Sequence, residues 1–266
     1  QALQLGLHVD ADALVRAADE GDLPPATLTA ILDEIDGGDF SPSAAPILND
    51  PATTVVLLNL NAVIGVPVVD SNDDGAFDVA NGDKIGVSCA LCHSVTDGSV
   101  LDLPDAGSIG TRVDGRTNFV VDIGDIFAAA DNSRALYPLL QVEFDSLGEA
   151  TIGTAANGLT EDSTEAEVDA WLVDDDIYPR GHFDGIPDGI GAPTRMQHFF
   201  RSDLGAPWGY AGDFDNLSDF NNFVYAIDFD LTVLATDDGE TLLNALAGPA
   251  GQELHDDRGR DIGHDA

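Results

Sequence analysis

The chain has only two cysteines, which stand three residues apart, and a histidine follows the second one directly. The segment reads Cys89-Ala90-Leu91-Cys92-His93. On a helical turn, this spacing brings both sulfurs to one side and lets the neighbouring imidazole reach the same place. Two thioether bonds to haem c and one histidine ligand to its iron need these residues in this order. The segment therefore predicts one covalent haem, held by Cys89 and Cys92, with His93 binding the iron.

Three other uses of such a cysteine pair fit the sequence less well. A structural zinc site needs four ligands, usually with a second Cys/His pair, and the chain has no further cysteine. A thioredoxin-type redox pair does not require the histidine, and its strand-then-helix flanks are missing from the pattern. A disulfide across so short a loop would be strained. We therefore interpret the segment as a haem site.

The charge of the chain is strongly acidic, because 49 aspartates and glutamates face ten basic residues, for a formal net charge of −39. A hydrophobic fraction of 44% nevertheless belongs to a globular protein. We expect a folded chain whose acidic surface is screened by salt or bound cations, hence a saline environment. Such a surface repels nucleic acid and attracts redox partner proteins with a cationic face.

The motif also predicts where the protein works. Haem c is attached outside the cytoplasm, so we expect a periplasmic or extracellular protein. The first residue is Gln1 rather than Met, which agrees with a signal peptide removed before it. No transmembrane segment is predicted, because the most apolar stretch, 55–69, contains asparagine, glycine and proline and is shorter than the ~20 residues that a spanning helix needs.

The sixth position of the iron decides between an electron carrier and a reactive haem. Methionine or histidine closes this position, whereas an open one admits peroxide or oxygen. Met196 is the only methionine, and it lies in a loop-rich region after the motif. We predict Met196 as the distal ligand, with His198 as the alternative and His182 as a further candidate. Four arginines are candidates to pair with a haem propionate or with a carboxylate of the chain: Arg112, Arg116, Arg195 and Arg201.

An acidic stretch just before the motif follows the beginning of a calcium-binding loop. Asp70, Asn72 and Asp74 supply oxygen atoms at alternate positions, Gly75 permits the sharp turn, and Asp78 stands at the ninth position. The twelfth position is asparagine instead of glutamate, so the stretch is not a complete EF-hand. It predicts Ca²⁺ at Asp70, Asn72 and Asp74, with a solvated turn as the alternative.

Local signals predict helices at the beginning of the chain. Residues 9–21 combine a capping aspartate, an apolar stripe and a terminal glycine, and residues 24–35 begin with prolines and end before two glycines. These helices form a hairpin which, with a connector, makes up residues 1–52. A cytochrome c-like haem domain is expected at 53–248, followed by a polar tail at 249–266.

Further along, an apolar face predicts a helix at 123–136. A capping box formed by Thr164 and Glu167 predicts another at 164–173. Glycines and aspartates make 98–122 a region of long loops. The remaining expectations are helices at 216–226 and 239–247, a strand at 227–233, and either strand or buried helix at 53–69.

Several segments share one family's pattern. Residues 82–93 lead through glycine, isoleucine and serine into the motif, and Asp-Gly-Arg-Thr-Asn follows at 114–118. Ala-Pro-Trp-Gly-Tyr-Ala-Gly stands at 206–212, before Asn-Leu-Ser-Asp-Phe at 216–220. These segments resemble the ISCASCH, GRN and APYxHDG–TLEEV motifs of the di-haem cytochrome c peroxidase family. The resemblance implies a mostly helical cytochrome c-like fold and an origin among redox enzymes.

The chain departs from that family at three places. It has cysteines for one haem instead of two, Tyr210 stands where the family has a histidine, and Val224 lies near the place of the family's methionine ligand. Catalysis in that family passes electrons between two haems, so the resemblance does not imply peroxidase activity of that kind.

These patterns together predict a mainly α chain: a cytochrome c-like helical haem domain with long loops, an N-terminal helical hairpin and a few short strands. The predicted function is electron transfer by an extracytoplasmic cytochrome c with one haem. Two alternatives stay open. One is a peroxidase- or oxidase-like enzyme with an open distal site, and the other is a haem-bearing subunit that self-assembles into an extracellular filament or joins a respiratory complex.

Overall fold

The computed structural model describes residues 2–72, 77, 81–130, 132–137, 143–144, 150–151, 158–160, 162–184, 189, 191 and 193–198, with scattered positions between 215 and 256. The chain forms two compact units. Unit 1 comprises Gln1–Ile123 and Arg195–Phe200, and unit 2 comprises Gly124–Thr194 and Arg201–Ala266. The segment Arg195–Phe200 therefore belongs to the unit that contains the cysteine motif.

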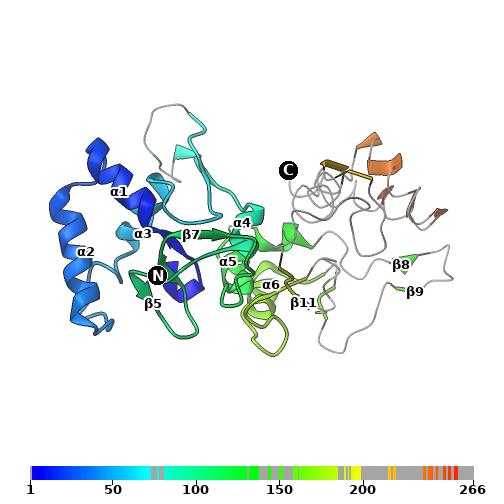
Figure 1. Cartoon of the computed structure of the whole chain (residues 1–266). Helices are drawn as coiled ribbons and strands as arrows, with labels where there is room; N and C mark the ends of the chain where they lie inside the picture. The colour runs from blue at the N-terminus through cyan, green and yellow to red at the C-terminus, as the bar shows by residue number, and fades with distance from the viewer. Residues whose placement is uncertain are drawn as a thin grey trace. The chain divides into compact units, whose positions relative to one another are not determined.

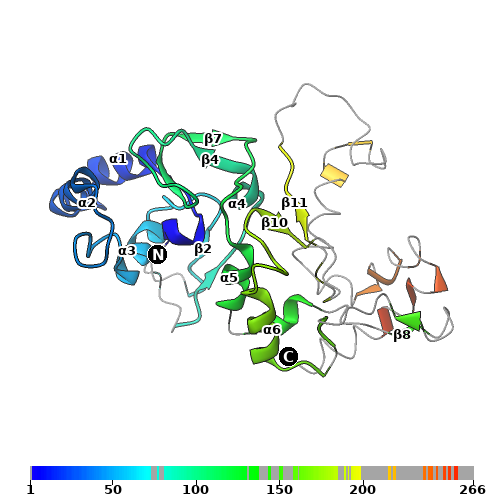
Figure 2. The same cartoon turned by 90° about the horizontal axis from the view of Figure 1, so that it is seen from below.

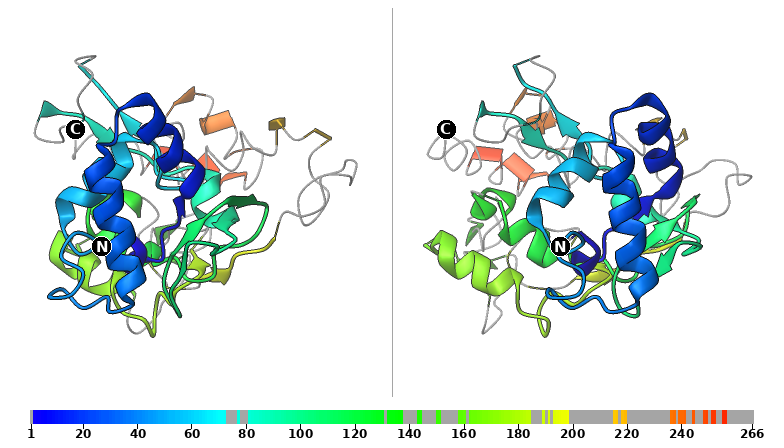
Figure 3. Two further views of the ribbon diagram at one scale, coloured as in Figure 1. Left: turned by 60° about the vertical axis from the view of Figure 1, so that its left-hand side comes forward. Right: turned by 90° about the vertical axis from the view of Figure 1, so that its left-hand side faces the viewer.

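Unit 1 begins with a short 3-10 helix, η1 (Ala2–Leu5), and the predicted helical hairpin. In α1 (Ala11–Glu20), the side chain of Asp10 accepts the N–H of Asp12, and Gly21 ends the helix in the left-handed conformation at φ 88°. Helix α2 (Pro25–Gly37) begins with proline and ends at Gly38. The two helices lie side by side (Figures 1 and 3), which confirms the prediction of a hairpin.

The ambiguous stretch after the connector contains both kinds of structure. Helix α3 (Pro51–Asn59) starts at Asp50, whose side chain accepts the N–H of Ala52, and it buries Leu57 and Leu58. The chain then becomes extended and forms β2 (Val68–Val69), which pairs antiparallel with β3 (Lys84–Ile85). This second pairing leads directly into the motif.

Two small sheets surround the motif. The strand β1 (Val9–Asp10) runs parallel to β6 (Ser108–Gly110), and β5 (Leu101–Asp102) pairs antiparallel on the other side of β6. The strand β4 (Ser94–Thr96), immediately after the motif, pairs antiparallel with β7 (Arg112–Asp114) (Figure 2). The pairing of β4 with β7 therefore brings the chain after β7 back beside the motif.

The prediction of a mainly α fold is wrong. Helix makes up 40% and strand 12% of the confidently placed residues, and the strands form several small sheets. Residues 98–122, predicted as long loops, contain β5, β6 and β7. Val9 of β1 pairs with Ile109 of β6 across a large separation in sequence, and local composition could not show this partner.

Unit 2 contains most of α5 (Ile123–Ala128), the 3-10 helix η3 (Ser133–Leu136) and α6 (Glu165–Leu172). The capping box predicted for α6 is present, because the N–H of Thr164 donates to Glu167 at 2.8 Å. The helix predicted at 123–136 is shorter and interrupted. The side chain of Ser133 instead donates to Asp169 on α6 at 2.7 Å, and this contact holds η3 against α6.

Two further small strand pairs follow. One pair is β8 (Glu143–Phe144) with β9 (Ala150–Thr151), and the other is β10 (His182–Phe183) with β11 (Thr194–Arg195), whose second residue already belongs to unit 1. Trp171 of α6 packs edge-to-face against Tyr137 and Tyr178, with ring centroids 5.3 and 6.4 Å apart. These rings form the core of this unit among its described residues.

Several expectations are not decided by this structure. The helices expected at 216–226 and 239–247, the strand at 227–233 and the tail at 249–266 fall wholly or mainly outside the described residues. The domain division after residue 52 stays a prediction. Among the helices that are described, none is long and apolar enough to cross a membrane.

Candidate functional site

The motif folds as α4 (Cys89–His93), one short helical turn between Ser88 and Ser94, which are both extended. Cys89 is exposed, Cys92 is half-buried, and both are free thiols. Leu91, between them, lies in the core and is only 2% exposed. One turn therefore carries all three residues that haem c attachment needs, with its apolar side anchored in unit 1.

Gly65 fixes the position of α4 from one side. Its carbonyl accepts the N–H of Ser88 at 2.9 Å. Its φ of +81° is in the left-handed region, and a Cβ there would lie 2.0 Å from the backbone nitrogen of Leu91. A residue with a side chain cannot occupy this position without moving α4. The sequence contains no local signal for this role.

The loop after β7 fixes α4 from the other side. The N–H of Gly115 donates to the carbonyl of His93, and the N–H of Asn118 donates to that of Cys92, each at 2.8 Å. The side-chain amide of Asn118 also donates to Leu91 at 3.2 Å and to Gly6 at 2.9 Å. These bonds satisfy carbonyls at the end of α4. The sequence singled out Arg116 of this loop as a candidate propionate partner, whereas Asn118, which is 1% exposed, was noted only within the GRN-like segment and received no role.

The segment that contains Met196 and His198 returns to unit 1. His198 Nδ1 accepts the N–H of Thr117 at 2.9 Å, and its ring meets Phe119 edge-to-face at 5.2 Å. The guanidinium of Arg195 lies 4.4 Å from the Phe119 ring centroid. Met196 is buried, with 9% exposure. The two predicted distal ligands therefore lie in the same unit as the motif.

His93 is held in the state that suits a metal ligand. Burial lowers the pKa of His93, a hydrogen bond with the Gln197 backbone raises it in part, and His198 nearby lowers it. The imidazole is therefore neutral at pH 7. A neutral imidazole keeps a lone pair on one ring nitrogen, which a metal ligand requires.

His198 is held in the opposite way. Because the N–H of Thr117 donates to Nδ1, that nitrogen is an acceptor, and the proton of the neutral ring resides on Nε2. Neither nitrogen then offers a lone pair to iron. This hydrogen bond favours Met196 over His198 as the distal ligand.

The two thiols differ in their surroundings. Burial, and to a lesser extent the neighbouring Cys89, raises the pKa of Cys92 to about 12. Because the thiolate is the reactive form of cysteine, Cys92 is the less reactive partner as the chain stands.

The other predicted residues lie elsewhere. Asp70 accepts the N–H of Asn72 at 3.3 Å, but Asp74 is outside the described residues, so the calcium site stays a prediction. His182 Nδ1 contacts the carbonyl of Arg180 in unit 2 at 2.9 Å. In the described part of the chain, no cluster of three or more His, Cys, Asp or Glu side chains can hold a metal ion.

Of the four candidate propionate partners, Arg112 pairs with Asp114 at 2.6 Å, and Arg195 covers Phe119. Arg116 lines a cavity, and Arg201 is outside the described residues.

No protein family, curated protein or solved structure matches this chain. The resemblance to the di-haem peroxidases therefore stays a proposal that rests on the motif and the loops quoted for it.

Proposed function

We propose that the chain is an extracytoplasmic cytochrome c that transfers electrons through one haem attached to Cys89 and Cys92. Bound haem supplies one-electron transfer between Fe(II) and Fe(III). The observation that carries the proposal is the single helical turn α4, which presents Cys89, Cys92 and His93 together.

The surrounding residues support this role by keeping α4 rigid. Gly65 and Asn118 hold the turn from both sides, and Leu91 anchors it in the core. A fixed turn keeps the iron ligand in place between the two redox states, which lowers the rearrangement that electron transfer requires. The acidic surface attracts a redox partner with a cationic face. Salt screens this attraction, so the complex dissociates faster as the salt concentration rises.

The distal ligand decides how the site works. Met196 would close the distal position and give an electron carrier. An iron held by His93 alone would leave that position open, and the contact of the Gln197 backbone with His93 favours this second candidate, a peroxidase- or oxidase-like enzyme.

The test is to produce the full chain in a host that attaches haem c and to record its mass and its optical spectra in both oxidation states. We expect one covalent haem, a reversible transition, and the weak red band of a methionine–ferric iron bond. If Met196 binds the iron, Met196→Leu removes that band and keeps the haem. If the distal site is open, the same substitution leaves the spectrum unchanged. High-spin bands with rapid cyanide binding favour the enzyme, and a colourless chain refutes both proposals.

A further inference from the structure

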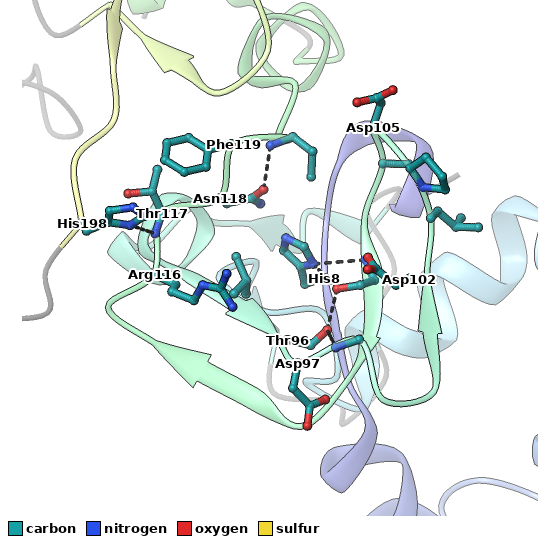
Figure 4. A pocket seen from close by; sticks show the side chains of 17 residues that line it. His8, Thr96, Asp97, Asp102, Asp105, Arg116, Thr117, Asn118, Phe119 and His198 are labelled. Atoms are coloured by element: carbon teal, nitrogen blue, oxygen red, sulfur yellow. Dashed lines mark hydrogen bonds between the residues drawn. The ribbon is translucent and has the colours of Figure 1, made fainter.

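Unit 1 has a cavity of about 620 Å³ beside the motif (Figure 4). It is bounded by His8 just before β1, by the end of β4, by the turns around β5 and by the loop that follows β7. His8, Arg116 and Thr117 line it, together with Asn118, whose backbone also bonds to Cys92. Neither thiol nor the His93 ring lines this cavity, so it is distinct from the site of covalent attachment.

His8 points a buried N–H into this cavity. The side chain is 6% exposed, and its Nδ1 accepts the backbone N–H of Ser108 at 3.1 Å. Burial lowers the pKa of His8, so the ring is neutral with its proton on Nε2. A side-chain hydrogen bond with Asn118 raises that pKa in part. By distance and angle, however, Nε2 has no hydrogen-bond partner among the described residues. A buried donor of this kind is costly without an acceptor.

Thr117 adds a second buried polar atom to the same cavity. The residue is 3% exposed, and its Oγ1 has no hydrogen-bond partner among the described residues. The exposed side chain of Arg116 precedes it and lines the cavity as well. Two neutral donors and a guanidinium in one cavity are the groups that recognise a carboxylate.

Three aspartates line the cavity, and they differ in how they act on an anion there. Asp97 is engaged, because its Oδ1 accepts the backbone N–H groups of Ser99 and Thr111 at 3.0 and 2.9 Å. The carboxylate of Asp105 points away from His8 (Figure 4). Asp102 acts on His8 electrostatically and therefore opposes an anion beside it.

We propose that this cavity binds a carboxylate group, which accepts hydrogen bonds from His8 Nε2 and Thr117 Oγ1 and pairs with Arg116. The carboxylate has two sources with the same chemistry: a free small carboxylic acid, or a propionate of the bound haem. The second source rests on the proposed function, whereas the site itself does not. Asn118 connects the cavity to the motif, which makes a tethered propionate the nearer source.

The experiment titrates the purified full chain with sodium acetate at constant ionic strength and follows the ring protons of His8 by NMR. It uses the chain made without haem attachment and the reduced haem-loaded chain. In the haem-free chain we expect a saturable shift. Arg116→Gln weakens acetate binding about ten-fold or more, and Asp102→Asn strengthens it. Arg112→Gln removes an equal charge outside the cavity and changes binding less than about two-fold.

The outcomes separate the two sources. Acetate excluded from the haem-loaded chain assigns the site to a propionate, and acetate bound equally to both forms assigns it to a free acid. Absence of a saturable shift in the haem-free chain overturns the proposal, as do equal losses in Arg112→Gln and Arg116→Gln. Because this arm needs no haem, it still decides the proposal if the chain never becomes a cytochrome.

Discussion

The turn α4 and the segment Arg195–Phe200 each bring a histidine into unit 1, but the two imidazoles are held in opposite ways. His93 is half-buried and hydrogen-bonds the Gln197 backbone, whereas His198 is exposed and accepts the N–H of Thr117. The position of the proton, rather than nearness to the motif, decides which ring can bind a metal. A histidine ligand is therefore best judged by the hydrogen bond at its other nitrogen.

The strongest test of this comparison replaces each histidine by alanine. His93→Ala abolishes the low-spin spectrum and the reversible redox transition, because the iron loses its proximal ligand. His198→Ala retains both, because that ring is held by Thr117 and not by iron. Optical spectra of the two haem-loaded variants check this, with haem content per chain as the control. Equal damage in both variants contradicts the assignment.

A second test disturbs α4 without touching either histidine. Gly65→Ala places a methyl group against the Leu91 backbone and is expected to cost about 3 kcal/mol or more of unfolding free energy. Gly82→Ala is the matched control, because Gly82 also has positive φ but nothing within 4 Å of a Cβ. Only the conformational cost of about 1 kcal/mol applies there. Urea unfolding at fixed salt measures both, and equal losses refute the close approach of Gly65.

The two thiols of α4 offer a third test, on the haem-free chain. Iodoacetamide at pH 8 labels exposed Cys89 at least about ten-fold faster than Cys92, whose pKa is raised to about 12 by burial. Peptide mapping by mass spectrometry gives the two rates. In urea the rates converge, since unfolding removes the burial. Equal rates in the folded chain contradict the placement of Cys92.

The smallest expected effect concerns acid. Burial lowers the pKa of both His8 and His93 from the ordinary value of 6.5, so the unfolded chain binds more protons as the pH falls through that value. Unfolding free energy therefore decreases between pH 7.5 and 5.5. Hydrogen bonds with Ser94 and Arg112 lower the pKa of Asp114. The stability that this carboxylate contributes is therefore lost only in stronger acid. Urea titrations across this window measure the slope, and His8→Gln flattens it; an unchanged slope in that variant contradicts the burial of His8.

Helices were predictable where their signals are local. Asp10 and Gly21 mark the ends of α1, and Thr164 with Glu167 marks the start of α6, within a few residues of each helix. The pairing of β6 with β1 was not predictable, because Val9 is distant in sequence, although β6 also pairs with the nearby strand β5. Fold class was therefore assigned wrongly although three helices were placed correctly.

The candidate site was likewise predictable only in its local part. The spacing of Cys89, Cys92 and His93 can be read directly from the sequence. Gly65 and Asn118 have their roles only because the folded chain brings them against α4. The residues next to them in the sequence do not predict this contact. The contrast between His93 and His198 depends on the placement of one proton, which only the folded hydrogen-bond network determines.

The amide of Asn118 has a consequence for the order in which the protein matures. It reaches Gly6, 112 positions away, and the Leu91 carbonyl at the same time. Closing so long a stretch of chain is slow compared with forming a single turn. The two cysteines therefore stay accessible during folding for longer than the burial of Cys92 in the final structure suggests, and the proposed haem attachment would have to take place before this closure.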